Sequence, residues 1–157
     1  MIQVDKIVNR VFNSNTYILR SDNSQDVWLV DCGDIDRIIE TLFDDEIVIG
    51  VLITHGHSDH IYGLNELINK YPFVKIYTSE FGLEEFMSDK LNFSRYHEEY
   101  SGFIINKLDN VYVILNSLLC SLGGRLEQGT HINIEADIGI TCSYYLSTAV
   151  VTILTQL

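Results

Sequence analysis

Proline, cysteine and positive charge are all scarce in this 157-residue sequence. The single proline is Pro72, and the cysteines are Cys32, Cys120 and Cys142, with no Cys-x-x-Cys pair among them. Each cysteine is therefore expected to be a small buried side chain rather than a metal ligand or a disulfide partner. Only 10 lysines and arginines stand against 22 aspartates and glutamates, which gives a formal net charge of -12. This acidity argues against nucleic acid or an anionic membrane surface as the main partner.

The two ends of the chain carry no clear membrane or export signal. Residues 1–6 lack a basic stretch followed by an apolar core, so no signal peptide is visible and cytoplasmic residence is expected. Residues 138–157 contain no charge and are long enough to cross a membrane. However, seven serine, threonine and glutamine side chains make this segment too polar for a span. Its isoleucine, valine, threonine and tyrosine content predicts strand structure instead.

The length and the 46% hydrophobic content fit one globular α/β domain over residues 1–157. Alternating strand and helix patterns in the first half predict a sheet covered by amphipathic helices. Asp34 and Ser79 are good N-cap residues for two of these helices. The predicted strands are 2–11, 15–19, 27–30, 47–53 and 74–77, and the predicted helices cover 35–43, 61–71 and 81–87.

A dense group of polar residues follows the apolar run 47–53. Within Thr54–His60 stand three of the five histidines and one carboxylate: His55, His57, Asp59 and His60. Imidazole nitrogens and carboxylate oxygens are ligands of zinc and similar divalent metals. In an extended segment His55 and His57 share a face and can converge on one ion. Asp59 and His60 follow a turn, so they are expected to point elsewhere and to hold a second ion.

This motif resembles the metallo-β-lactamase superfamily, whose signature is His-x-His-x-Asp-His. The match is complete at His55, His57, Asp59 and His60. The segments 15–17 (Asn-Thr-Tyr) and 31–33 (Asp-Cys-Gly) resemble the strands that usually precede the signature. The resemblance covers residues 1–90 well and implies an αββα sandwich whose second half is incomplete or degenerate, with residues 138–157 as an atypical tail.

The resemblance also implies a chemistry. It predicts one or two Zn²⁺ ions, with iron or manganese as alternatives, held by the four signature residues. Asp59 is expected to orient a metal-activated water that attacks a small-molecule substrate. Related enzymes hydrolyse β-lactams, thioesters, phosphodiesters and lactones, or use iron in redox chemistry. The hydroxyacylglutathione-hydrolase-like group is the most similar, so a small ester or thioester is the leading expectation.

Other polar residues leave alternatives open. Asp31 is expected either to orient a metal-binding imidazole or only to close a turn with Gly33. Cys32 is expected to be structural. His97 lies in a polar loop and His131 at an expected strand start, so each is a solvated or surface histidine unless the fold brings it to the metals.

The second half of the sequence lacks the further metal ligands that the resemblance implies. No Pro-Gly-His turn and no later Gly-Asp pair follows, and no histidine stands beyond His131. One explanation is a short variant completed by a partner or by oligomerisation; another is a truncated or frame-shifted product. In either case open apolar strand faces predict self-association into homo-oligomers or poor solubility. The rival to a hydrolase is a catalytically inactive metal-binding remnant or a protein-interaction subunit.

Overall fold

The computed structural model describes residues 2–22, 24–98 and 101–114. These residues form one mixed sheet of six strands, in the spatial order β1-β2-β3-β4-β5-β6. The first three strands pair antiparallel, and β3 to β6 run parallel. The strands are β1 (Ile2–Val8), β2 (Asn15–Ser21), β3 (Asp26–Val30), β4 (Ile47–Leu52), β5 (Lys75–Thr78) and β6 (Val111–Val113).

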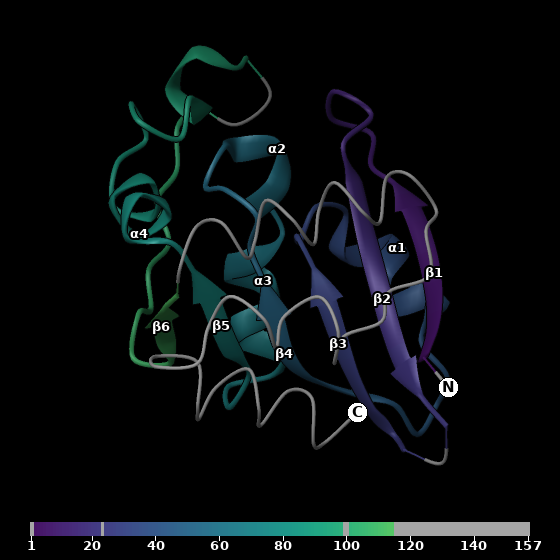
Figure 1. Ribbon diagram of the computed structural model, residues 1–157. Helices are drawn as coiled ribbons and strands as arrows, with labels where there is room; N and C mark the ends of the chain where they lie inside the picture. The colour runs from purple at the N-terminus through teal and green to yellow at the C-terminus, as the bar shows by residue number, and fades with distance from the viewer. Residues whose placement is uncertain (1, 23, 99–100, 115–157) are drawn as a thin grey trace, which may run out of the picture.

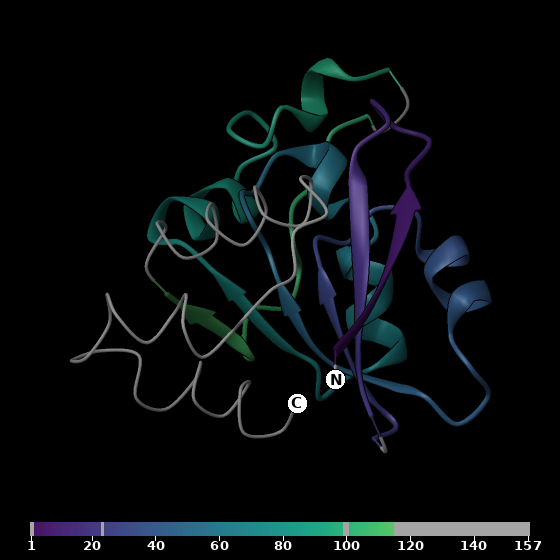
Figure 2. The ribbon, with the colours of Figure 1, turned by 45° about the vertical axis from the view of Figure 1, so that its right-hand side comes forward.

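Short helices connect successive parallel strands along the chain, and they pack on one side of the sheet (Figures 1 and 2). Their apolar residues pack with alternate strand residues such as Leu29 and Val51 into one buried core. Ile38 and Leu67 contribute the inward faces of two of these helices and are fully buried. The helices are α1 (Ile35–Thr41), α2 (Ser58–Ile61), α3 (Leu64–Lys70) and α4 (Glu80–Phe86), followed by the 3-10 turn η1 (Ser94–Tyr96).

The other face of the sheet is apolar as well. Trp28 and Tyr77 belong to a second buried cluster with their ring centroids 5.7 Å apart. Tyr77 also stacks on Tyr112 of the next strand, at 5.3 Å. A sheet with an apolar surface on both sides is typical of a layered α/β fold in which each face is covered.

The predicted elements are confirmed with shifted boundaries, apart from one broken helix. The pattern over 61–71 predicts one continuous helix, whereas α2 ends at Ile61 and α3 begins at Leu64. A Cβ atom on Gly63, between the two helices, would lie 2.1 Å from the carbonyl oxygen of Gly33. Glycine is therefore the residue that this close approach allows between the two helices. The strand β6 and the turn η1 are absent from the sequence prediction.

Asp34 and Ser79 both occupy the N-cap positions expected of them, but of the two only Ser79 makes a side-chain capping hydrogen bond. Asp34 occupies the N-cap position of α1, but its side chain makes no capping hydrogen bond. Its carboxylate instead accepts hydrogen bonds from the Arg10 amide and the Tyr62 hydroxyl. On α4, Gly82, Glu85 and Phe86 face inward, and Phe81 is 58% exposed. The predicted cap at Ser79 is confirmed: its hydroxyl accepts from the Gly82 amide at 2.9 Å.

The predicted strand structure of 138–157 and the predictions for His131, Cys120 and Cys142 fall outside the described residues. Within the described residues, no helix is both long and apolar enough to cross a membrane.

Candidate metal centre

The histidine motif lies at the carboxyl end of β4, where the parallel strands end. Figure 1 shows α2, which carries Asp59 and His60, beyond the tips of β3 and β4. Loops gather at this end of a parallel sheet, so side chains from distant parts of the chain can meet there. The motif is fixed from two sides by hydrogen bonds from other loops. The Ser14 hydroxyl donates to the carbonyl of Asp59, and the Ser58 amide donates to the carbonyl of Asn92.

The three imidazoles of the motif lie together. The ring centroids of His55 and His57 are 4.6 Å apart, in agreement with the expectation that these two side chains converge. His60 lies even closer to His55, at 4.1 Å. The expectation that His60 points away from the pair is therefore wrong, because the single turn of α2 brings its ring back beside the loop. Asp59 stays with His60: its Oδ2 lies 3.3 Å from His60 Nε2.

Two buried carboxylates stand behind the imidazoles. Asp31 Oδ2 lies 2.8 Å from His60 Nδ1, and Glu85 Oε1 lies 3.5 Å from His57 Nε2. Both carboxylates are almost fully buried, with 3% and 1% of the residue exposed. Carboxylates in this position fix the orientation of an imidazole and the nitrogen that carries its proton.

Asp31 does more than close a turn. Its Oδ1 accepts from the Thr54 amide at 2.8 Å, and its Oδ2 accepts from the Thr54 hydroxyl at the same distance. The residue has a positive φ of 60°, a conformation that aspartate tolerates better than most residues. Of the two interpretations of Asp31, the structure favours the first: its carboxylate holds an imidazole of the motif.

Burial and neighbouring charges shift the pKa of His55. Burial lowers the pKa of His55, and the nearby His60 and His57 lower it further, while Asp31 and Asp59 act in the opposite direction. The neutral imidazole is the form that binds a metal. Burial also raises the pKa of Glu85, although the Gly56 amide and His57 partly offset that effect.

Cys32 does not join the metal motif. Its side chain is fully buried in the helix-side core, and its thiol is not in a disulfide. Burial, followed by the negative charges of Asp31 and Glu66, raises the pKa of this thiol. A thiol held neutral is a poor metal ligand, so the expectation of a structural cysteine is confirmed.

His97 contacts an aromatic side chain from the loop after β1. Its ring packs edge-on against Phe12, with centroids 4.8 Å apart. The residue beside the imidazoles from the loop of His97 is instead Phe93, whose ring meets His57 edge-on at 4.8 Å. Phe93 has a positive φ of 65° and is half exposed. The aromatic side chain next to the metal motif was not predicted from the sequence.

Glu85 was missed for an identifiable reason. An acidic residue on a short helix ordinarily faces water. The available signal was the spacing of Gly82, Glu85 and Phe86, which puts these residues on one helix face. That face is the buried one.

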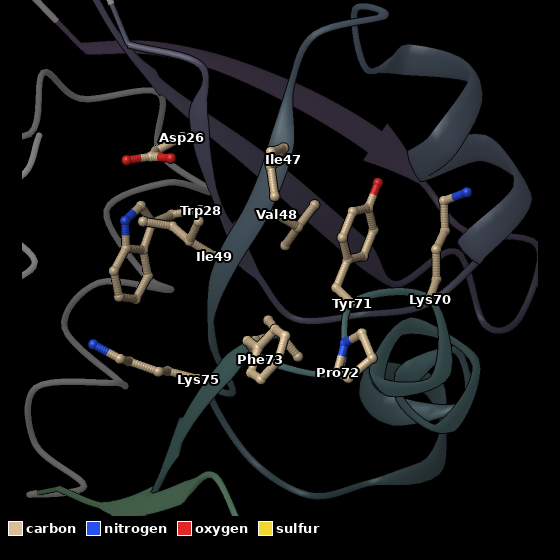
Figure 3. Close-up of a pocket in the computed structure, with 11 residues that line it drawn as sticks. Asp26, Trp28, Ile47, Val48, Ile49, Lys70, Tyr71, Pro72, Phe73 and Lys75 are labelled. Carbon is tan, nitrogen blue, oxygen red and sulfur yellow. The ribbon is translucent and has the colours of Figure 1, made fainter.

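A cavity of about 420 Å³ lies at the opposite end of the sheet (Figure 3). Its lining includes Asp26, Ile47 and Lys75, which are the first residues of β3, β4 and β5. Figure 3 shows aromatic side chains around it, including Trp28 and Phe73. Because the histidines follow the last residue of β4, this cavity is separate from the metal motif.

The donor chemistry of the motif suits a divalent metal: three imidazoles and a carboxylate, two of the imidazoles backed by buried acids. Among the residues that the structure describes, however, no three His, Cys, Asp or Glu side chains form a group that could hold an ion. The motif therefore fits a metal ion by the kinds of ligand that it offers and by their closeness to one another, but not by their arrangement around one point. Each ion would need further ligands, or a closer approach of those present.

The family model of the metallo-beta-lactamase superfamily matches residues 9–151. The chain belongs to the metallo-beta-lactamase superfamily. The match extends well past the first 90 residues and covers most of the chain. The resemblance stated from the His-x-His-x-Asp-His motif is thus confirmed.

Individual relatives match shorter stretches. The chain is 40% identical to a hydroxyacylglutathione hydrolase of Hahella chejuensis over 63 residues, which cover 39% of this chain and 24% of that protein. The chain thus spans about a quarter of the length of this curated relative. Among solved structures, the BLEG-1 B3 metallo-beta-lactamase is similar with a TM-score of 0.62 and 19% identity, over 72% of this chain and 54% of that one.

The structure of TTHA1623 in a di-iron-bound form is also similar, with a TM-score of 0.55 and 18% identity. The alignment covers 71% of this chain and 54% of that one. These two likenesses show the fold: an α/β sandwich fold with a mixed six-stranded sheet, shared over about 70% of the chain. The expected metallo-β-lactamase fold is therefore confirmed over this part of the chain.

Proposed function

We propose that this protein is a metal-dependent hydrolase that cleaves a small ester or thioester with a metal-activated water. The observation that carries the proposal is the group of three imidazoles and one carboxylate beyond the end of β4, backed by two buried acids. Membership of the superfamily and the partial likeness to a hydroxyacylglutathione hydrolase support the choice of chemistry.

In this proposal His55 and His57 hold one ion, and Asp59 and His60 hold a second. When bound, a divalent ion lowers the pKa of a coordinated water and polarises the carbonyl that is attacked. Zinc is the first choice for imidazole and carboxylate ligands, and iron or manganese suit a similar set. Asp59 also accepts a hydrogen bond from the attacking water and so directs it.

The protein supplies orientation and an apolar surface beside the motif. Asp31 holds His60 by its Nδ1, which sets Nε2 toward Asp59. Phe93 lies edge-on to His57 and covers one side of the cluster with an apolar surface. This surface suits the apolar part of a small acyl substrate.

The second candidate is a metal-binding domain without catalytic activity, or a subunit that acts through protein contacts. The specific observation in its favour is that, among the described residues, no three ligand-type side chains are arranged so that they could hold one ion. Zinc held by two protein ligands binds more weakly than zinc held by three or four. The two candidates differ in metal retention and in turnover.

Both properties are measured on the purified protein. Under the hydrolase proposal, zinc stays bound in stoichiometric amount after dialysis, and chromogenic esters and thioesters are cleaved faster than phosphodiesters and lactones. His57→Ala removes the zinc and the hydrolysis together, whereas His97→Ala, a histidine outside the motif, leaves both in place. Hydrolysis that continues after complete metal removal would contradict the mechanism, and retained zinc without any turnover favours the second candidate.

A further inference from the structure

Glu85 is a buried acid that the His-x-His-x-Asp-His motif does not include. It belongs to α4, which follows β5, and stands 28 positions after His57 in the sequence. Only 1% of the residue is exposed. Burial of a carboxylate is costly unless hydrogen bonds or an opposite charge compensate it. The groups that Glu85 contacts therefore indicate why it is there.

Both carboxylate oxygens of Glu85 face the motif. Oε2 accepts a hydrogen bond from the Gly56 amide at 2.7 Å, and Oε1 lies 3.5 Å from His57 Nε2. The approach requires glycine at position 56, because a Cβ atom there would lie 2.5 Å from Glu85 Cβ. One carboxylate thus contacts two successive residues of the loop, one through its backbone and the other through its side chain.

We propose that Glu85 is a positioning residue. Its carboxylate accepts a hydrogen bond from the Nε2–H group of His57 and so leaves Nδ1 of that ring to bind the metal. This inference rests on the proposed function insofar as His57 is a metal ligand. A neutral imidazole has one N–H group, and its acceptor determines which ring nitrogen is left with a lone pair. With 41% of its side chain exposed, His57 has room for the small ring rotation that shortens the 3.5 Å contact to a hydrogen bond.

One histidine of each ion-binding pair is then held by a buried acid, and the two acids lie on opposite sides of the loop. Asp31, at the end of β3, holds His60 by Nδ1, and Glu85, from α4, holds His57 by Nε2. The two rings thus present different nitrogens to the space between them. This difference follows from the positions of the two acids, one on either side of the loop.

A purely structural role for Glu85 is the alternative, in which the carboxylate only satisfies the Gly56 amide. The variant Glu85→Gln separates the two roles. The glutamine oxygen can still accept from the Gly56 amide, but its NH₂ group then faces His57 Nε2 and cannot accept a proton from it. The matched control is Glu84→Gln, an exposed acid on the same helix.

The direct readout is the tautomer of His57, measured by ¹⁵N NMR of the imidazole in the metal-free protein at about pH 8, where unperturbed histidine is neutral. We expect the Nε2–H tautomer in the wild type and in Glu84→Gln, and the Nδ1–H tautomer in Glu85→Gln. We also expect Glu85→Gln to bind Zn²⁺ roughly 10- to 100-fold more weakly, as is usual when the acid behind a metal-bound imidazole is removed.

An Nδ1–H tautomer in the wild type would overturn the proposal, and this result does not depend on how Glu85→Gln folds. An unchanged tautomer in a folded Glu85→Gln protein would overturn it as well. Because the tautomer is read without metal, a failure here is distinct from a failure of the proposed hydrolase. Failure of the hydrolase proposal would instead appear as zinc retention that His57→Ala does not affect.

Discussion

Asp31 Oδ2 lies 2.8 Å from Nδ1 of His60, across 29 residues of sequence. The same carboxylate accepts two hydrogen bonds from Thr54, at the start of the histidine loop. The end of β3 thereby holds both the beginning and the end of the motif. This link between neighbouring parallel strands fixes where the imidazoles stand before any metal arrives.

Replacement of Asp31 by asparagine tests this link. Asparagine tolerates the positive φ of this position, but an NH₂ group in place of Oδ2 can accept a hydrogen bond neither from His60 nor from the Thr54 hydroxyl. We expect a loss of about 1–3 kcal/mol in the free energy of unfolding and a zinc affinity lowered by roughly 10- to 100-fold. Urea denaturation and metal titration measure the two effects. Asp44→Asn, at an exposed position, should change neither, and equal losses in both variants would contradict this role.

The contact between Gly50 and Trp28 tests the packing of the second apolar face. A Cβ atom on Gly50 would lie 2.1 Å from the indole ring of Trp28, which is 2% exposed. Gly50→Ala therefore forces the ring to move. Overpacking of this kind costs about 1–3 kcal/mol, visible in urea unfolding and in the tryptophan fluorescence of the folded state. Lys75→Ala, on the neighbouring strand at an exposed position, serves as the control. Wild-type stability in Gly50→Ala would show that the ring is loosely packed.

The buried thiol of Cys32 predicts a dependence of stability on alkaline pH. Burial raises its pKa in the folded state, whereas in the unfolded chain a cysteine ionises near about 8.5. The stabilising contribution is complete below that unfolded value and is lost as the pH rises toward the folded one. The free energy of unfolding should therefore fall by up to about 1.4 kcal/mol per pH unit above pH 8.5.

The comparison that isolates this effect is between the wild type and Cys32→Ala. Urea unfolding from pH 7 to pH 10 should show a steeper alkaline loss in the wild type, because the variant lacks the ionising group. In the folded wild type, peptide mapping after thiol labelling should find Cys32 unmodified. Equal slopes in both proteins, or labelling of Cys32 in the native state, would show that the thiol is accessible.

The sequence by itself determined the family and most of the sheet. Apolar runs of strand length, helices with an i, i+3, i+4 stripe, and four ligand-type residues after a buried strand are all local features. Local patterns are visible in a single sequence because backbone periodicity ties them to neighbouring residues. The signature His55, His57, Asp59 and His60 identified the superfamily in this way, and the family comparison confirmed it.

Tertiary structure decided which groups support the imidazoles. Asp31 could have closed a turn, and its contact with His60 depends on how β3 pairs with β4. The burial of Glu85 follows from the packing of α4 against the histidine loop, and its spacing with Gly82 and Phe86 was the one local signal of an inward face. The need for glycine at position 63 likewise depends on a carbonyl 30 residues away in sequence. Contacts between distant segments determine these features, and such contacts cannot be inferred from a local sequence pattern.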